Sequence, residues 1–181
     1  MNAGAARHVR HLVRRFFGSL PPGGPRPDDD AWARSHLLPG ELDLWGEMRG
    51  PDRRHAVAVA RRVDAAIDDA AVGVNERAVL AAALLHDVGK LEAGLGPIGR
   101  VAATLTAGML GHRRVSTWSN RRGWAGRFGR YVLHPDLGGL LLAGAGSDTL
   151  TMAWAMEHHR PPAEWTVPAE VGSILKTADD D

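Results

Sequence analysis

The chain has 181 residues, a formal net charge of +1 and no cysteine. This length suits one domain with a sizeable core, and a charge so close to zero favours no class of partner. Because cysteine is missing, disulfide bonds and thiolate metal ligands are excluded, so any metal must be held by histidine and carboxylate groups. The chain has no apolar run of about 18 residues, which a transmembrane helix would need, and no signal-peptide pattern. We therefore expect a cytoplasmic protein without a transmembrane segment.

Residues 1–50 are expected to form a leading region. Apolar residues recur at helical spacing over residues 9–20, with arginines off the stripe, which predicts a basic amphipathic helix. Residues 21–27 are rich in proline and glycine and predict a linker or a turn. Residues 28–48 predict two leading helices separated by a turn at Pro39-Gly40. The basic helix either packs on the domain or contacts an anionic membrane or nucleic acid.

Residues 51–181 are expected to form the main domain, which we predict to be all-α. Alanine, leucine and arginine are abundant, and alternating runs of β-branched residues are missing. Gly50-Pro51-Asp52 predicts the start of a helix. Asn75 predicts the N-cap of another helix over residues 76–88, which is apolar on all sides and is therefore expected to be buried. Gly89 is expected to be its left-handed C-cap.

Three further helices are expected, over residues 135–142, 148–158 and 168–178, which gives roughly eight helices in total. They follow a basic stretch, residues 93–135, that contains no acidic residue before Asp136. Its arginines form either a positive rim that steers an anionic substrate or a solvated, membrane-touching face. In the second case Trp118 and Trp124 would be interfacial anchors.

The adjacent pair His86-Asp87, at the end of the predicted buried helix, is the first indication of chemistry. A carboxylate and an imidazole beside an apolar core are costly unless they are paired or bound to a metal. Lys90 follows closely, as one of the chain's two lysines, where a phosphate would need a cation. Other predicted helices carry further candidates, each of which alone also fits a helix cap or an ordinary exposed side chain: His55, His134, His158, His159 and Asp179.

The order His55, then His86-Asp87, then Asp179 resembles the H…HD…D ligand pattern of the HD superfamily of metal-dependent phosphohydrolases. The segment LLHDVGK, residues 84–90, is similar to the HD-x-GK form found in the cyclic-di-GMP phosphodiesterase branch. His134-Pro135 and the pair His158-His159 resemble the HP-x-x-G and HH segments of that branch. The GYP signature is missing after His159, and the interval before His134 is longer than we expect, which argues against cyclic-di-GMP as the substrate.

The resemblance implies an HD-domain helical bundle that holds one or two divalent ions, and Mn, Fe, Ni and Zn all suit such ligands. It implies a first ion on His55, His86, Asp87 and Asp179, with Asp180 as the alternative last ligand. It implies a second ion on His134, His158 and His159, with Asp87 bridging the two. Asp87 and Lys90 would be the catalytic residues, and the substrate phosphate would contact Lys90 and Arg160.

The sequence therefore predicts an enzyme that hydrolyses a phosphate mono- or diester, for which we expect a nucleotide, by metal-activated water. The alternative is a regulatory HD protein with little turnover that binds a nucleotide or a partner. A third interpretation is a peripheral membrane or nucleic-acid adaptor that uses the arginine-rich segments. The expected partner is a phosphate-containing small molecule, and we do not expect nucleic-acid binding because no recognisable fold motif supports it.

Overall fold

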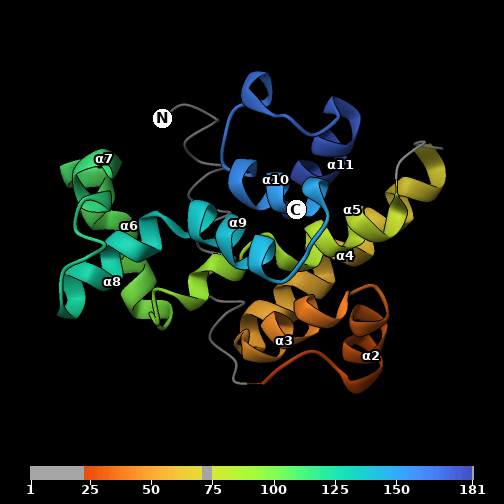
Figure 1. The fold of residues 1–181 in the computed structure, drawn as a ribbon, viewed down its shortest axis with the longest axis horizontal. Coiled ribbons are helices and arrows are strands. Elements are labelled where there is room, and N and C mark those ends of the chain that lie inside the picture. Colours follow the sequence, from red (N-terminus) through yellow and green to blue (C-terminus); the bar gives the residue numbers. More distant parts are fainter. Residues whose placement is uncertain (1–22, 71–74, 181) are drawn as a thin grey trace, which may run out of the picture.

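The computed structural model describes residues 23–70 and 75–180. The basic amphipathic helix predicted over residues 9–20 lies outside them. The described residues form ten α-helices and two short 3-10 helices, without a strand, which confirms the all-α prediction (Figure 1).

Two leading helices, α2 (Pro27–Ser35) and α3 (Pro39–Glu47), pack against the rest of the protein. Pro39 begins α3 instead of forming a turn, because proline is well suited to the first position of a helix. The indole N–H of Trp45 donates to the Asp30 carboxylate at 2.9 Å and ties α3 to α2. Ala33 and Trp45 belong to the same buried cluster as Leu80, so the core is continuous across residue 50.

The centre of the fold is formed by α4 (Gly50–Ala70) and α5 (Glu76–Leu85), which pack against each other. As predicted, α4 begins at Gly50, and the side chain of Asn75 caps α5 by accepting from the backbone N–H of Ala78 at 3.4 Å. Every residue of α5 from Ala78 onward is buried, which confirms that an all-round apolar helix belongs in the core.

The prediction for Gly89 was wrong. Helix α5 ends at Leu85, before a turn at His86-Asp87 and the 3-10 helix η1 (Val88–Leu91). Gly89 lies inside η1 and is not among the residues with positive φ. Glycine is required for a different reason, because a Cβ at this position would overlap the carbonyl oxygen of His134. The absence of a side chain lets η1 lie directly against the start of a helix that comes much later in the chain.

That helix, α9 (His134–Gly144), packs beside α10 (Thr149–Glu157), which in turn covers α5. The Thr151 hydroxyl donates to the Ala78 carbonyl at 3.0 Å and fixes α10 on α5. After the short 3-10 helix η2 (Pro162–Glu164), α11 (Ala169–Asp180) returns to pack on α4. The ends of α4, α5, α9, α10 and α11 are thereby positioned around one buried region.

The basic stretch forms a separate lobe at one end of the molecule, made of α6 (Pro97–Leu110), α7 (His112–Ser116) and α8 (Gly123–Val132) (Figure 1). The lobe has a small core of its own around Leu95 and Ala103, with Phe128 and Tyr131 packed against it. Because the sequence predicts no helix over residues 93–135, the expected total of roughly eight falls short of the ten α-helices of the described residues. None of the helices among the described residues is both long and apolar enough to cross a bilayer.

Candidate metal centre

The structure brings seven of the predicted site residues together from five helices. They are His55 in the second turn of α4, His86 and Asp87 after α5, His134 at the start of α9, His158 and His159 after α10, and Asp179 in the last turn of α11. Most of this cluster is withdrawn from solvent. His55 is partly buried, His159 is exposed, and the other five side chains are buried.

Asp87 lies at the middle of the cluster. Its Oδ1 is 3.5 Å from Nε2 of His134 and 3.7 Å from Nε2 of His158. Its Oδ2 is 3.4 Å from Nε2 of His86 and also forms an ion pair with the ammonium group of Lys90. The two oxygens of one carboxylate therefore face two different sets of histidines.

Three histidines present the same ring atom to this centre. Nδ1 of His86, His134 and His158 lies 2.9, 2.7 and 2.9 Å from the carbonyl oxygen of the residue three positions earlier. A carbonyl can only accept, so Nδ1 carries a proton in all three rings, and Nε2 is the atom with the lone pair wherever the ring is neutral. For His134 and His158, Nε2 is buried without a hydrogen-bond partner among the described residues. Imidazole rings oriented in this way are typical of metal ligands.

The donor atoms fall into two groups that could each hold a metal ion. His55, His86 and Asp87 form one group, and His134, His158 and His159 form the other; within each group the donor atoms lie within 4.8 Å of one another.

Asp179 joins the first of these groups. Its Oδ1 is 3.1 Å from Nε2 of His55 and 3.6 Å from Nε2 of His86. Asp180 is exposed, and its carboxylate accepts from Lys176 at 2.9 Å, so Asp179 is the carboxylate that faces the histidines.

The charge states of the cluster suit a cation. Burial lowers the pKa of His134, and it lowers the pKa of His158 further, so both rings are neutral at neutral pH. Burial alone would raise the pKa of Asp87, but Lys90, His86 and His134 outweigh it and hold that pKa well below its usual value. His134 and His158 thus offer neutral nitrogen donors beside a charged oxygen donor, which is the state in which these groups bind metals.

A pocket opens beside Asp87 and Lys90, between the start of α4, η1 and α6. Its walls include Arg49, Asp52 and Arg100. Arg100 forms a bidentate ion pair with Asp52, at 2.5 and 2.6 Å, that is largely shielded from solvent. Arg49 is exposed and forms no ion pair with any described residue. The pocket therefore presents a cation that is available to an anionic ligand next to the histidine–carboxylate cluster.

Sequence reasoning missed this pocket. In the sequence, Asp52 indicates only the start of a helix and Arg100 belongs only to the basic stretch, because nothing in their spacing shows that they pair. The predicted substrate contact Arg160 is exposed immediately after His159. Among the described residues, no contact connects its guanidinium group to the cluster.

Comparison of the chain with known protein families, characterised proteins and solved structures finds no match. The interpretation of this site therefore depends on its own residues and their geometry.

Proposed function

We propose that this protein is a metal-dependent phosphohydrolase of the HD type that hydrolyses a phosphate mono- or diester, with a nucleotide as the first candidate. The observation that carries the proposal is the position of Asp87, whose two oxygens face separate histidine groups while Lys90 and the pocket lie beside it. A carboxylate between two sets of nitrogen donors is what a two-metal hydrolytic site needs.

A first ion would be held by His55, His86, Asp87 and Asp179. A second ion would be held by His134, His158 and His159, with Asp87 beside both groups. When bound, such ions supply an activated water and offset negative charge during phosphoryl transfer. Nitrogen and carboxylate ligands suit Mn, Fe, Ni or Zn.

The chain's own residues would bind and orient the substrate. Lys90 lies at the boundary between the cluster and the pocket and would contact the phosphate that undergoes hydrolysis. Arg49, on the pocket wall, would hold a second anionic group of the substrate. The ion pair between Asp52 and Arg100 would keep this wall fixed, because both side chains are mostly buried. A substrate with more than one anionic group, such as a nucleotide, fits this arrangement of cations.

The test starts with the metal content of the purified full chain, followed by assays on nitrophenyl phosphate, bis-nitrophenyl phosphate and a set of nucleotides with added Mn, Ni or Zn. We expect bound metal and metal-dependent release of phosphate or alcohol. Asp87→Ala should lose both, whereas Asp43→Ala, an exposed aspartate of α3, should keep both.

Two outcomes would oppose the proposal. Equal metal content in Asp87→Ala and in the unchanged protein would show that the cluster around Asp87 is not the metal site. Full metal without turnover of any phosphate ester would instead favour a regulatory protein that binds a nucleotide or a partner at the same cluster.

A further inference from the structure

Helix α6 has its small residues inside and its large apolar residues outside. Gly99, Ala103 and Ala107 are buried and form the face that packs within the lobe. By contrast, Ile98, Leu105 and Met109 are 78%, 62% and 84% exposed. Amphipathic helices of soluble domains normally place their large apolar side chains in the core. The outer surface of α6 is therefore an apolar surface that none of the described residues covers, as expected of a binding surface.

The exposed apolar side chains form a continuous strip. Positions 98, 101, 105 and 109 recur at spacings of three and four, so they share one side of the helix, and Val101 is 41% exposed. The strip is about 16 Å long at the rise of an α-helix. Trp124, at the start of α8, is 62% exposed, and its ring lies over Gly99, the residue that follows Ile98 in α6. We refer to Ile98, Val101, Leu105, Met109 and Trp124 as the α6 apolar face.

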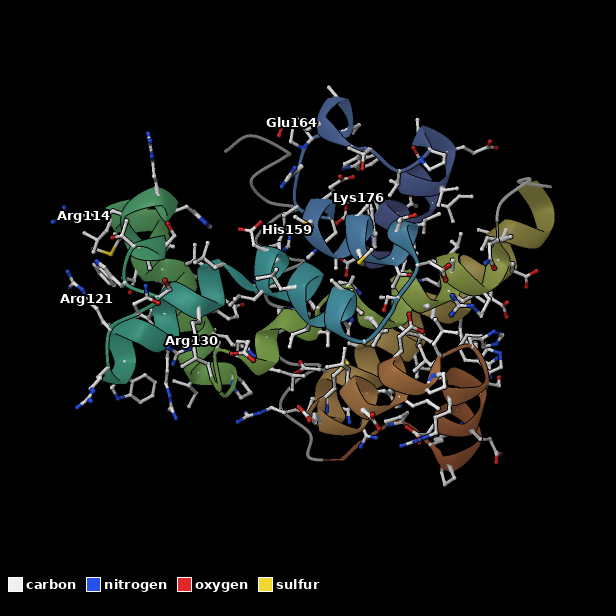
Figure 2. All side chains as sticks on the ribbon, viewed as in Figure 1. Arg114, Arg121, Arg130, His159, Glu164 and Lys176 are labelled. Carbon is white, nitrogen blue, oxygen red and sulfur yellow. The ribbon has the colours of Figure 1, made fainter. Side chains whose placement is uncertain are left out.

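The lobe that carries this face is strongly basic. Residues 93–135 contain no aspartate or glutamate. The lobe's exposed arginines lie on α7, on α8 and between them: Arg113, Arg114, Arg121, Arg122 and Arg127. Figure 2 shows Arg114 and Arg121 extending from the outer end of the lobe, away from the bundle. The Arg127 guanidinium lies 5.7 Å from the centre of the Trp124 ring, so one cation directly adjoins the α6 apolar face.

The apolar strip and the exposed arginines together distinguish between three possible binding partners of this face. A second copy of the chain would cover the apolar strip, but it would also bring two sets of exposed arginines together, which repel each other. A nucleic acid would satisfy the arginines but has no apolar surface for leucine and methionine side chains. The surface of an anionic bilayer offers both kinds of contact, because its acyl chains can contact the α6 apolar face while its negatively charged headgroups contact the exposed arginines.

We propose that the lobe formed by α6, α7 and α8 docks on anionic membranes, with the α6 apolar face lying in the interface and the surrounding arginines among the headgroups. Trp124 fits the role of an interfacial anchor, because indole rings favour the headgroup level. The contact would be peripheral, since none of the described helices is suited to span a bilayer. This inference concerns a surface outside the histidine–carboxylate cluster and does not depend on the proposed hydrolytic activity.

The experiment is co-sedimentation of the full chain with vesicles of phosphatidylcholine alone and of phosphatidylcholine mixed with phosphatidylserine, at low and high salt. We expect binding to the mixed vesicles that weakens as salt rises, because the headgroup attraction is screened. The double variant Leu105→Glu/Met109→Glu should bind about tenfold or more weakly, because two side chains no longer enter the apolar layer. Leu140→Glu is the matched control, because Leu140 is an exposed residue of α9 outside the lobe. This variant should bind the vesicles as the unchanged chain does.

Circular dichroism and urea denaturation would establish that the double variant is folded. The proposal is overturned if the unchanged chain ignores mixed vesicles at low salt, or if the double variant still binds them equally well. It is also overturned if sedimentation shows a dimer that the double variant abolishes, since the face would then serve a second copy. Binding to an oligonucleotide that is unaffected by the double variant, without vesicle binding, would assign the arginines to nucleic acid instead.

Discussion

The ammonium group of Lys90 forms an ion pair with Oδ2 of Asp87, the same oxygen that faces His86. Lys90 therefore occupies the side of the carboxylate that borders the pocket, and it neutralises a buried negative charge. The same ammonium group lines the pocket, where under the proposed function it would contact the substrate phosphate.

This relationship predicts that Lys90→Met separates metal binding from turnover. The variant removes the proposed phosphate contact but none of the proposed ligands, so it should retain its metal while kcat falls by about 100-fold. Metal analysis and steady-state kinetics on the best ester would measure the two effects. Lys176→Met is the matched control, because Lys176 is the chain's other lysine and pairs only with exposed Asp180 among the described residues. Loss of metal in Lys90→Met would show that the ion pair with Asp87 maintains the site instead.

Two neighbouring aspartates give a sharp test of the ligand set. Asp179→Asn should weaken metal binding by more than about tenfold, because its carboxylate faces His55 and His86. Asp180→Asn should leave binding unchanged, because that carboxylate points to Lys176 at the surface. Competition with a chelator of known affinity would measure both variants. Equal effects of the two substitutions would mean that Asp179 contributes only through the general charge of the region.

Arg49 is expected to act on substrate affinity alone. Arg49→Gln removes the exposed cation of the pocket wall, so KM for a nucleotide should rise roughly tenfold, as for the loss of a charge-assisted hydrogen bond. Metal content should not change, because Arg49 is not in either donor group. Arg114→Gln, at the far end of the lobe, is the control for loss of one positive charge. An unchanged KM with every ester tested would place the substrate on another side of the cluster.

Stability should depend on pH through Asp30, which joins α2 to α3 and α4. Burial opposes ionisation, but contacts with Arg34, Trp45 and Arg53 lower its pKa below the ordinary 3.8. A depressed pKa means stabilisation that is fully present above the unfolded-state value and is lost as pH falls through the folded-state value. Asp30→Asn should therefore reduce the free energy of unfolding by about 1 kcal/mol at pH 7, and the difference should shrink below about pH 4. Urea denaturation at several pH values would measure it; a difference that stays constant with pH would contradict the assignment.

The all-α class and the burial of α5 could be predicted from the sequence, because both follow from local composition and periodicity. The convergence of His55, His86 and His158 was expected from the order of the motifs, although only packing brings the ends of α4, α5 and α10 to one point. The choice between Asp179 and Asp180 was beyond local reasoning. Adjacent helix positions point about 100° apart, so the rotation of α11 against α4 decides which one faces inward.

The helices of the lobe were not predicted because α6 has its small residues on the packing face and its large apolar residues on the exposed face. An ordinary amphipathic helix of a soluble protein has the reverse arrangement. Gly99, Ala103 and Ala107 recur at a spacing of four and mark the packing face of α6, but the larger apolar side chains of the opposite face dominate the sequence pattern. The pairing of Arg100 with Asp52 joins residues 48 positions apart, and no local signal encodes such a contact.

The close approach of η1 and α9 at Gly89 predicts that this glycine controls the geometry of the site. A methyl group there would overlap the His134 carbonyl, so Gly89→Ala must push η1 away from α9. Overpacking of this kind typically costs about 1–3 kcal/mol of stability, and here it would also separate Asp87 from His134. We expect both a lower free energy of unfolding and weaker metal binding, measured by urea denaturation and chelator competition. Gly108→Ala is the matched control, because its Cβ would meet open space on a helix, where alanine is favoured by up to about 1 kcal/mol. Unchanged metal affinity in a destabilised Gly89→Ala would indicate that the second histidine group binds without help from Asp87.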